Sequence, residues 1–223
     1  MTRTERLLIV GDDGSADADV AWLWVCNHPW PHWRAEVITA TDPPFPPWDH
    51  PAELVEWDSP HPRMLIAQSQ LESVKTLTIE QDRRLALGAR SDADLLVVGP
   101  GRIGHTRMPV LGSTTDWLIH YPSSPTAVIR SASPTRRVLA CTDGSTHART
   151  AIETFAHLPW AAQTRVTILA VDDGRSDPTK SSEEAQAILH GAGVQSSTSI
   201  TKGKPTREIL RHIEDHDPHL VTI

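Results

Sequence analysis

The chain has 223 residues, of which 39% are hydrophobic and 22% are charged, a composition typical of soluble globular domains. This length accommodates one large domain or two small ones. The formal net charge of −7 argues against a polyanionic partner such as DNA or RNA, although backbone N–H groups can still hold a single nucleotide.

The sequence predicts no association with membranes and a location in the reducing cytoplasm. No apolar run approaches the roughly 20 residues that span a bilayer. The first residues lack the apolar core and the small-residue cleavage site of a secretory signal. The two cysteines, Cys26 and Cys141, show neither a disulfide framework nor a zinc-binding spacing.

Short apolar runs rich in β-branched residues recur along the chain, as in strands that are buried on both faces of a parallel sheet. The predicted strands are 7–10, 36–41, 94–98, 126–129, 138–141, 165–171 and 220–223. Segments with helical spacing lie between them, at 17–27, 146–157, 181–191 and 205–216. This alternation predicts a doubly wound α/β fold, which binds its ligands beyond the carboxyl ends of the strands.

The sequence also repeats itself. An apolar run, then Asp-Gly-Ser, then an Ala-containing helical segment occurs at Asp13 and again at Asp143, 130 positions later. A repeat of this length predicts two copies of one domain, residues 1–132 and 133–223. Ile223 corresponds to Val98, so the second copy is predicted to be truncated, without a glycine loop, the helix after it or a last strand.

A glycine-rich loop follows the strand predicted at 94–98, in the segment VVGPGRIGHTRMPVLGST, residues 97–114. Glycine-rich turns and helix N-termini bind anions through backbone N–H groups, and glycine allows a close approach of the backbone. Ser113 is the predicted N-cap of a helix that runs to His120 and stops before Pro122. The loop therefore predicts a site for phosphate groups.

These residues together resemble the universal stress protein family: Asp-Gly-Ser after the first strand, DADLLVVG, a glycine loop, and Gly-Ser at a helix start. Nucleotide-binding members carry Gly, two residues, Gly, nine residues, then Gly-Ser or Gly-Thr. Here the first glycine is Gly99 and the last pair is Gly112-Ser113, whereas Arg102 occupies the position of the second glycine. The resemblance covers nearly the whole chain as two tandem copies, and it implies a Rossmann-like five-stranded sheet.

The resemblance further implies that the first domain binds ATP, with or without Mg²⁺. Asp13 would contact the adenosine, the backbone around Ala40 would face the adenine, and the loop would hold the phosphates. The implied nucleotide-binding residues are Asp13, Gly14, Ala40, Gly99, Gly101, Arg102, Gly104, Gly112, Ser113 and Thr114. Two alternatives stay open: Asp13 could simply close a strand-to-helix turn, and Arg102 could fill the site and exclude a ligand.

Three functions are compatible with the sequence. The first is an ATP-binding regulator or sensor in a stress response. The second is a nucleotide-free interaction module that works through domain pairing or as a homodimer, with residues 125–130 as the pairing strand. The third is a nucleotide-using transferase. Because no nucleophile with a base, no paired carboxylates and no metal signature occur, we expect at most slow ATP hydrolysis.

The proline-rich residues 42–62 are predicted as a surface insertion or a lid.

Overall fold

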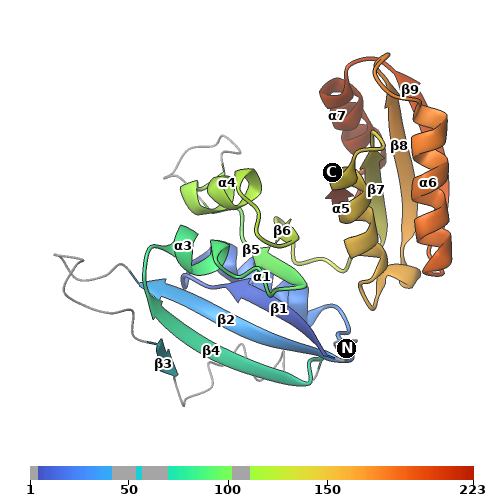
Figure 1. The fold of residues 1–223 in the computed structure, drawn as a ribbon. Coiled ribbons are helices and arrows are strands. Elements are labelled where there is room, and N and C mark those ends of the chain that lie inside the picture. The colour runs from blue at the N-terminus through green and yellow to red at the C-terminus, as the bar shows by residue number, and fades with distance from the viewer. Residues whose placement is uncertain (1–4, 42–53, 57–69, 102–110) are drawn as a thin grey trace. The chain divides into compact units, whose positions relative to one another are not determined.

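The computed structural model describes residues 5–41, 54–56, 70–101 and 111–223, in two compact units (Figure 1). Unit 1 is Met1–Ala132 and unit 2 is Ser133–Ile223. Most of the proline-rich segment lies outside the described residues. Within the described ranges, no helix has the length and apolar character needed to cross a membrane.

Unit 1 contains a six-stranded sheet in the order β3-β4-β2-β1-β5-β6. Its strands are β1 (Arg6–Gly11), β2 (Trp33–Thr41), β3 (Leu54–Glu56), β4 (Ser73–Glu80), β5 (Leu95–Val98) and β6 (Thr126–Val128). The five strands from β4 to β6 are parallel, which confirms the expected Rossmann-like sheet. The short β3 adds an antiparallel sixth strand at the edge, which the sequence does not predict.

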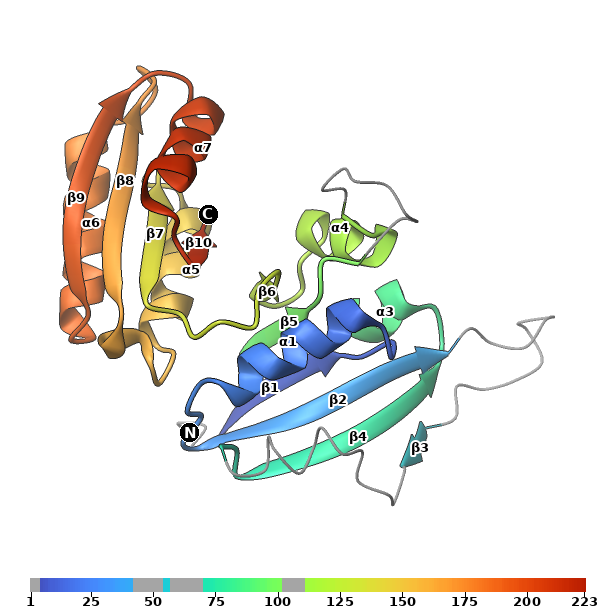
Figure 2. The same ribbon diagram turned by 180° about the vertical axis from the view of Figure 1, so that it is seen from behind.

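In the described residues of unit 1, three helices cover this sheet: α1 (Ala16–Cys26), α3 (Arg83–Gly88) and α4 (Ser113–His120). Figures 1 and 2 show α1 on one face, with α3 and α4 on the other. Side chains alternate between the two faces of a strand, so β1 is buried on both sides. Leu7 and Ile9 belong to the core cluster that includes Leu87 of α3, and every residue from Leu7 to Val10 is 0% exposed.

A cluster of aromatic side chains closes the core of unit 1 between the end of α1 and the start of β2. Trp24, Trp30 and Trp33 are each at most 3% exposed, and their rings meet in edge-on contacts. His28 is buried against Trp24, with ring centroids 4.6 Å apart, and its Nδ1 lies 2.7 Å from the Trp24 carbonyl oxygen. These tryptophans therefore serve packing.

Burial of His28 makes the stability of unit 1 depend on pH. Desolvation lowers the pKa of His28 below its usual value. The unfolded chain therefore binds a proton more readily than the folded one, so stability falls as the pH drops below about 6.5. We expect wild type to lose more stability than His28→Asn between pH 7.5 and pH 5.5, as measured by urea unfolding.

The matched control is His157→Asn. His157 is exposed, and its Nδ1 lies 2.6 Å from the carbonyl oxygen four residues before it, as in His28. Because His157 is exposed and belongs to unit 2, this variant should leave the pH dependence of the stability of unit 1 as in wild type. If the pH dependence of stability changed equally in His28→Asn and His157→Asn, burial of His28 would not be its cause.

Unit 2 repeats most of this arrangement with four parallel strands, in the order β10-β7-β8-β9. The strands are β7 (Arg137–Thr142), β8 (Arg165–Asp172), β9 (Gln195–Lys202) and β10 (Leu220–Thr222). The helices are α5 (Thr146–Ala156), the short 3₁₀ helix η1 (Ala161–Gln163), α6 (Pro178–Gly191) and α7 (Pro205–His216). The unit has neither a glycine loop nor a fifth strand within its described residues.

Candidate functional site

An open cavity in unit 1 lies at the carboxyl ends of β1, β2 and β5, the edge at which doubly wound sheets bind ligands. The β1–α1 turn forms one wall, and the residues around the start of α4 form another. The cavity is lined by Gly11, Asp12, Asp13, Ser15, Asp17, Ala18, Ile38, Ala40, Arg83, Leu87, Val98, Gly99, Gly101, Gly112, Ser113, Thr114 and Thr115.

Most of the predicted nucleotide-binding residues meet at this cavity. Seven of them line it: Asp13, Ala40, Gly99, Gly101, Gly112, Ser113 and Thr114. Gly14 is in the neighbouring turn but is not part of the lining. Arg102 and Gly104 lie outside the described residues. Parallel strands end at the same edge of a sheet, which is why residues almost 100 positions apart in the sequence come together here.

Asp12 and Asp13 hold the turn between β1 and α1. The Gly14 N–H donates to Asp12 Oδ1 at 2.8 Å, and the Ser15 N–H donates to Asp13 Oδ1 at 3.0 Å. Gly14 has φ of +74°, a conformation that favours glycine. Asp13 thus has the structural role that the sequence leaves open for it. This contact uses one of its two carboxylate oxygens.

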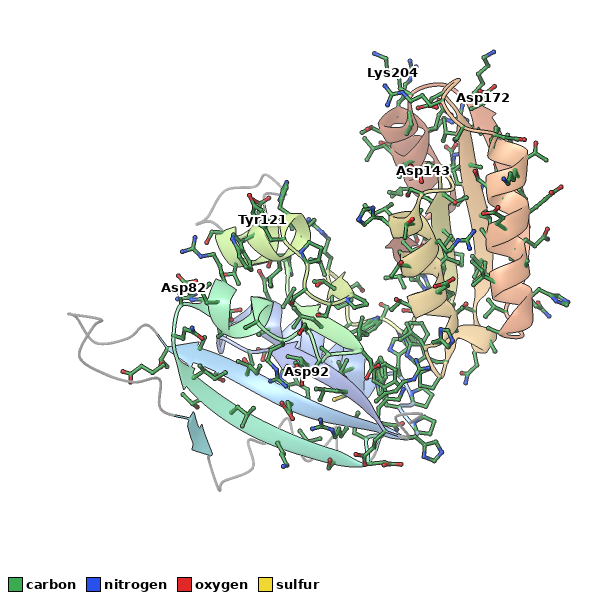
Figure 3. All side chains as sticks on the ribbon, in the orientation of Figure 1. Asp82, Asp92, Tyr121, Asp143, Asp172 and Lys204 are labelled. Carbon is green, nitrogen blue, oxygen red and sulfur yellow. The ribbon has the colours of Figure 1, made fainter. Side chains whose placement is uncertain are left out.

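The corresponding turn of unit 2 has the same geometry. The Ser145 N–H donates to Asp143 Oδ1 at 2.8 Å, and Gly144 has φ of +80°. Hydrogen bonds from Ser145 lower the pKa of the Asp143 carboxyl. Figure 3 labels Asp143 in this turn, before the start of α5. An Asp-Gly-Ser turn therefore forms in both units, whether or not a glycine loop is present.

The glycines beside the cavity are required by the protein's own packing. A Cβ on Gly99 would lie 2.6 Å from the Asp17 carbonyl oxygen, and a Cβ on Gly112 would lie 3.0 Å from the Gly101 Cα. Thr115 Oγ1 donates to the Gly99 carbonyl at 2.9 Å and further fixes this approach. The backbone of α1 and the packing of Gly101 against Gly112 thus limit side chains here, in addition to the close approach of a ligand that the sequence predicts.

The start of α4 differs from the prediction by one residue. The N-cap is Gly112, and Ser113 is the first helical residue. Gly112 has no side chain, so no side-chain hydrogen bond caps the helix. Helix α7 likewise has no side-chain cap, whereas α1, α3, α5 and α6 begin after a Ser or Asp whose side chain accepts a backbone N–H. The N–H groups of the first turn of α4 thus border the cavity without a side-chain cap.

The cavity is acidic on its β1–α1 wall. Asp12, Asp13 and Asp17 line it, with Arg83 as the cationic residue among the described lining residues. Asp12 Oδ2 also accepts a hydrogen bond from Trp22 Nε1 at 3.0 Å, and Asp17 is 8% exposed. In the parts of the chain that the structure describes, no three His, Cys, Asp or Glu side chains converge as a metal site.

Sequence reasoning misses Asp12, Asp17 and Arg83 as cavity residues. Asp12 adjoins the recognised Asp-Gly-Ser, so its position alone could have placed it here. Asp17 is in the first turn of α1, and this turn follows the Asp-Gly-Ser turn at the same edge of the sheet. Arg83 opens α3 after β4, a strand that the sequence analysis does not predict.

Comparison with known proteins adds a sequence relative. A universal stress protein from Mycolicibacterium smegmatis is 29% identical over an alignment of 142 residues, which covers 56% of this chain and 48% of the relative. The chain thus spans about half the length of the curated relative that it matches. No family profile matches the chain.

Solved structures share the fold over almost the whole chain. A universal stress protein from Archaeoglobus fulgidus aligns with a TM-score of 0.67 and 14% identity, covering 96% of this chain and 85% of its own. A protein of unknown function from Pseudomonas aeruginosa aligns with a TM-score of 0.57 and 15% identity, covering 97% and 80%. The chain thus has a universal stress protein as a sequence relative and shares the fold of solved universal stress proteins.

Proposed function

We propose that unit 1 binds ATP and that the protein acts as a regulator or sensor in a stress response rather than as an enzyme. The observation that carries this proposal is the start of α4, where Gly112 leaves the first-turn N–H groups of the helix without a side-chain cap beside the cavity. Such N–H groups, together with the helix dipole, bind phosphate oxygens.

The other walls of the cavity fit the rest of a nucleotide. Ile38, Leu87 and Val98 supply apolar surface for a base. The second oxygen of Asp13 is suited to accept a hydrogen bond from a ribose hydroxyl. Mg²⁺, if it accompanies ATP, would be held chiefly by the phosphates, because the described carboxylates do not converge as a metal site.

One rival function is supported by particular residues. In a nucleotide-free interaction module, Asp13 would only close its turn, as Asp143 does in unit 2. Arg102 stands where the nucleotide-binding members of the family carry glycine. This module would work through domain pairing or as a homodimer, and its assembly would not respond to nucleotide.

Calorimetric titration of ATP into the full chain, with and without Mg²⁺, separates the two functions. The sample is first freed of copurified nucleotide. We expect micromolar binding with one site per chain and no more than slow release of phosphate. A folded, nucleotide-free sample that takes up no ATP would favour the interaction module, and light scattering would then measure its assembly.

A further inference from the structure

Strand β9 forms one edge of the unit 2 sheet (Figure 2), and in the described residues no strand pairs with its outer side. The other strands at the sheet edges, β3, β6 and β10, have three residues each, whereas β9 has eight. An edge strand presents unpaired N–H and C=O groups that can pair with another chain, and short edge strands limit such pairing. Among the described strands, β9 is therefore the long open edge.

The sequence of β9 also lacks the features that protect an edge strand from pairing. Its first seven residues, Gln195–Thr201, contain no charge and no proline, and the one charge of the strand is on Lys202 at its end. The register with β8 runs without interruption over all eight residues, so no bulge twists the edge away. The side chains of Thr198 and Ile200 are exposed. The edge is thus open to a partner strand along most of its length.

The alternation of the backbone shows which residues of β9 would pair. The Gly203 N–H donates to the carbonyl oxygen of Asp172 in β8 at 3.1 Å, so the peptide groups of Gly203 face β8. Successive residues of a strand direct their N–H and C=O groups to opposite sides. The residues that direct these groups to the open side are therefore Ser196, Thr198 and Ile200.

The equivalent edge of unit 1 carries an antiparallel strand. The strand orders β4-β2-β1-β5 and β9-β8-β7-β10 correspond, so β4 and β9 occupy the same position in the repeat. In unit 1, β3 pairs with β4 antiparallel, with Val55 opposite Thr78. Thr78 is the sixth residue of β4, as Ile200 is of β9. This edge of the repeat therefore accepts an antiparallel strand at the position that β9 leaves open.

We infer that β9 is a self-association surface, on which β9 of a second copy of this chain pairs antiparallel about a two-fold axis at Thr198. In this register the uncharged Gln195–Thr201 of one copy lies against the same residues of the other, with Ser196 opposite Ile200. The charge of the strand favours this orientation. Antiparallel pairing places the two Lys202 side chains at opposite ends of the new ladder, whereas parallel pairing would place them side by side.

This contact uses the same residues in both copies, so it closes as a dimer and joins the two unit 2 sheets into one. It differs from the pairing through residues 125–130 that the sequence suggests, because those residues belong to unit 1. Dimerisation through β9 is compatible with ATP binding by unit 1 and does not depend on it.

Light scattering on the full chain at increasing protein concentration tests this inference. The variant Thr198→Lys places two like charges opposite each other at the two-fold axis. The control Leu210→Lys adds the same charge at a 55% exposed apolar residue of unit 2 that is in α7 rather than in the strand. We expect wild type and Leu210→Lys to reach the mass of two chains, and Thr198→Lys to weaken dimerisation about tenfold.

Hydrogen exchange on the same samples identifies the strand that pairs. The outward amides of Ser196, Thr198 and Ile200 should exchange more slowly as the wild-type dimer forms, whereas those of Ser197 and Ser199, which face β8, should change little. A second variant, Thr198→Pro, removes an outward N–H without removing a hydrogen bond to β8, and it should also weaken the dimer.

Three results would overturn the inference. The first is a wild type that stays monomeric at every concentration with unprotected outward amides. The second is a dimer that Thr198→Lys leaves intact, because another surface would then hold the two copies together. The third is protection of the outward amides in a monomer, because a segment of the same chain would then cover the edge.

Discussion

Replacement of Ser113 by Asp should strongly weaken nucleotide binding without destabilising unit 1. Ser113 is the exposed first residue of α4 and lines the cavity. A carboxylate at a helix N-terminus stabilises the helix by about 0.3–1 kcal/mol. The same carboxylate, at roughly 6 Å from a bound phosphate, would oppose it by about 3 kcal/mol, or roughly a hundredfold in affinity. Titration calorimetry measures the affinity, and urea unfolding measures the stability.

Two control variants isolate the effect of the charge at this position. Thr146→Asp places the same acid on the exposed first residue of α5 in unit 2, so it should stabilise its helix and leave nucleotide binding unchanged. Ser113→Asn keeps the size of the new side chain without its charge, and it should retain most of the affinity. If Ser113→Asp kept the nucleotide affinity of wild type, the start of α4 would not be part of the binding site.

Replacement of Gly99 by Ala should destabilise unit 1 and weaken nucleotide binding together. The added Cβ would lie 2.6 Å from the carbonyl oxygen and 2.7 Å from the carbonyl carbon of Asp17. Because these are backbone atoms, relief requires α1 to move relative to β5. Overpacking of this kind costs about 1–3 kcal/mol for one methyl group, and Gly99→Val should cost more. Urea unfolding and calorimetry on the same samples measure both losses.

Gly191→Ala is the matched glycine control. No atom lies within 4 Å of the position of its Cβ, and Gly191 is the last residue of α6. This substitution should be neutral or slightly stabilising, because alanine restricts the unfolded chain. If Gly99→Ala proved as harmless, the close packing of Gly99 against α1 would not hold in solution. Loss of binding in Gly99→Val alone cannot identify a phosphate contact, since the fold changes as well.

These two results bear differently on the function. Ser113→Asp changes charge at the cavity while preserving the packing, so it tests ligand binding directly. Gly99→Ala tests whether the packing of the loop against α1 requires glycine at position 99. Together they distinguish an anion site from a glycine turn that only serves packing.

Much of the order of strands and helices can be predicted from the sequence, because buried parallel strands and capped helices have characteristic patterns of neighbouring residues. The apolar run of β1, the Asp-Gly-Ser turn and the Ser caps of α1 and α5 depend only on neighbouring residues. The same local chemistry exposes the repeat, because Asp13 and Asp143 sit in equivalent turns. These signals were enough to indicate a doubly wound α/β fold and the family it resembles.

The sequence does not predict β3, β4 or β9, and for the two longer strands, β4 and β9, the reason is physical. β4 and β9 lie toward the sheet edges, and their sequences SVKTLTIE and QSSTSITK keep many residues partly or fully exposed. A strand without two covered faces needs no continuous apolar run, so the pattern that identifies β1 is missing. Their place in the sheet follows from pairing with β2 and β8, which are distant in the sequence.

The chemistry of the cavity likewise depends on contacts between distant segments. Sequence spacing brings Gly99 and Gly112 into one loop, but the need for glycine at Gly99 comes from Asp17, on a helix 82 residues earlier. The cap at Gly112 and the acidic wall of Asp12 and Asp17 also emerge only when β1, β5 and α4 meet at one edge. Residue types and their local order come from the chain, whereas the charge that a ligand would encounter is set by which strand ends the fold brings together.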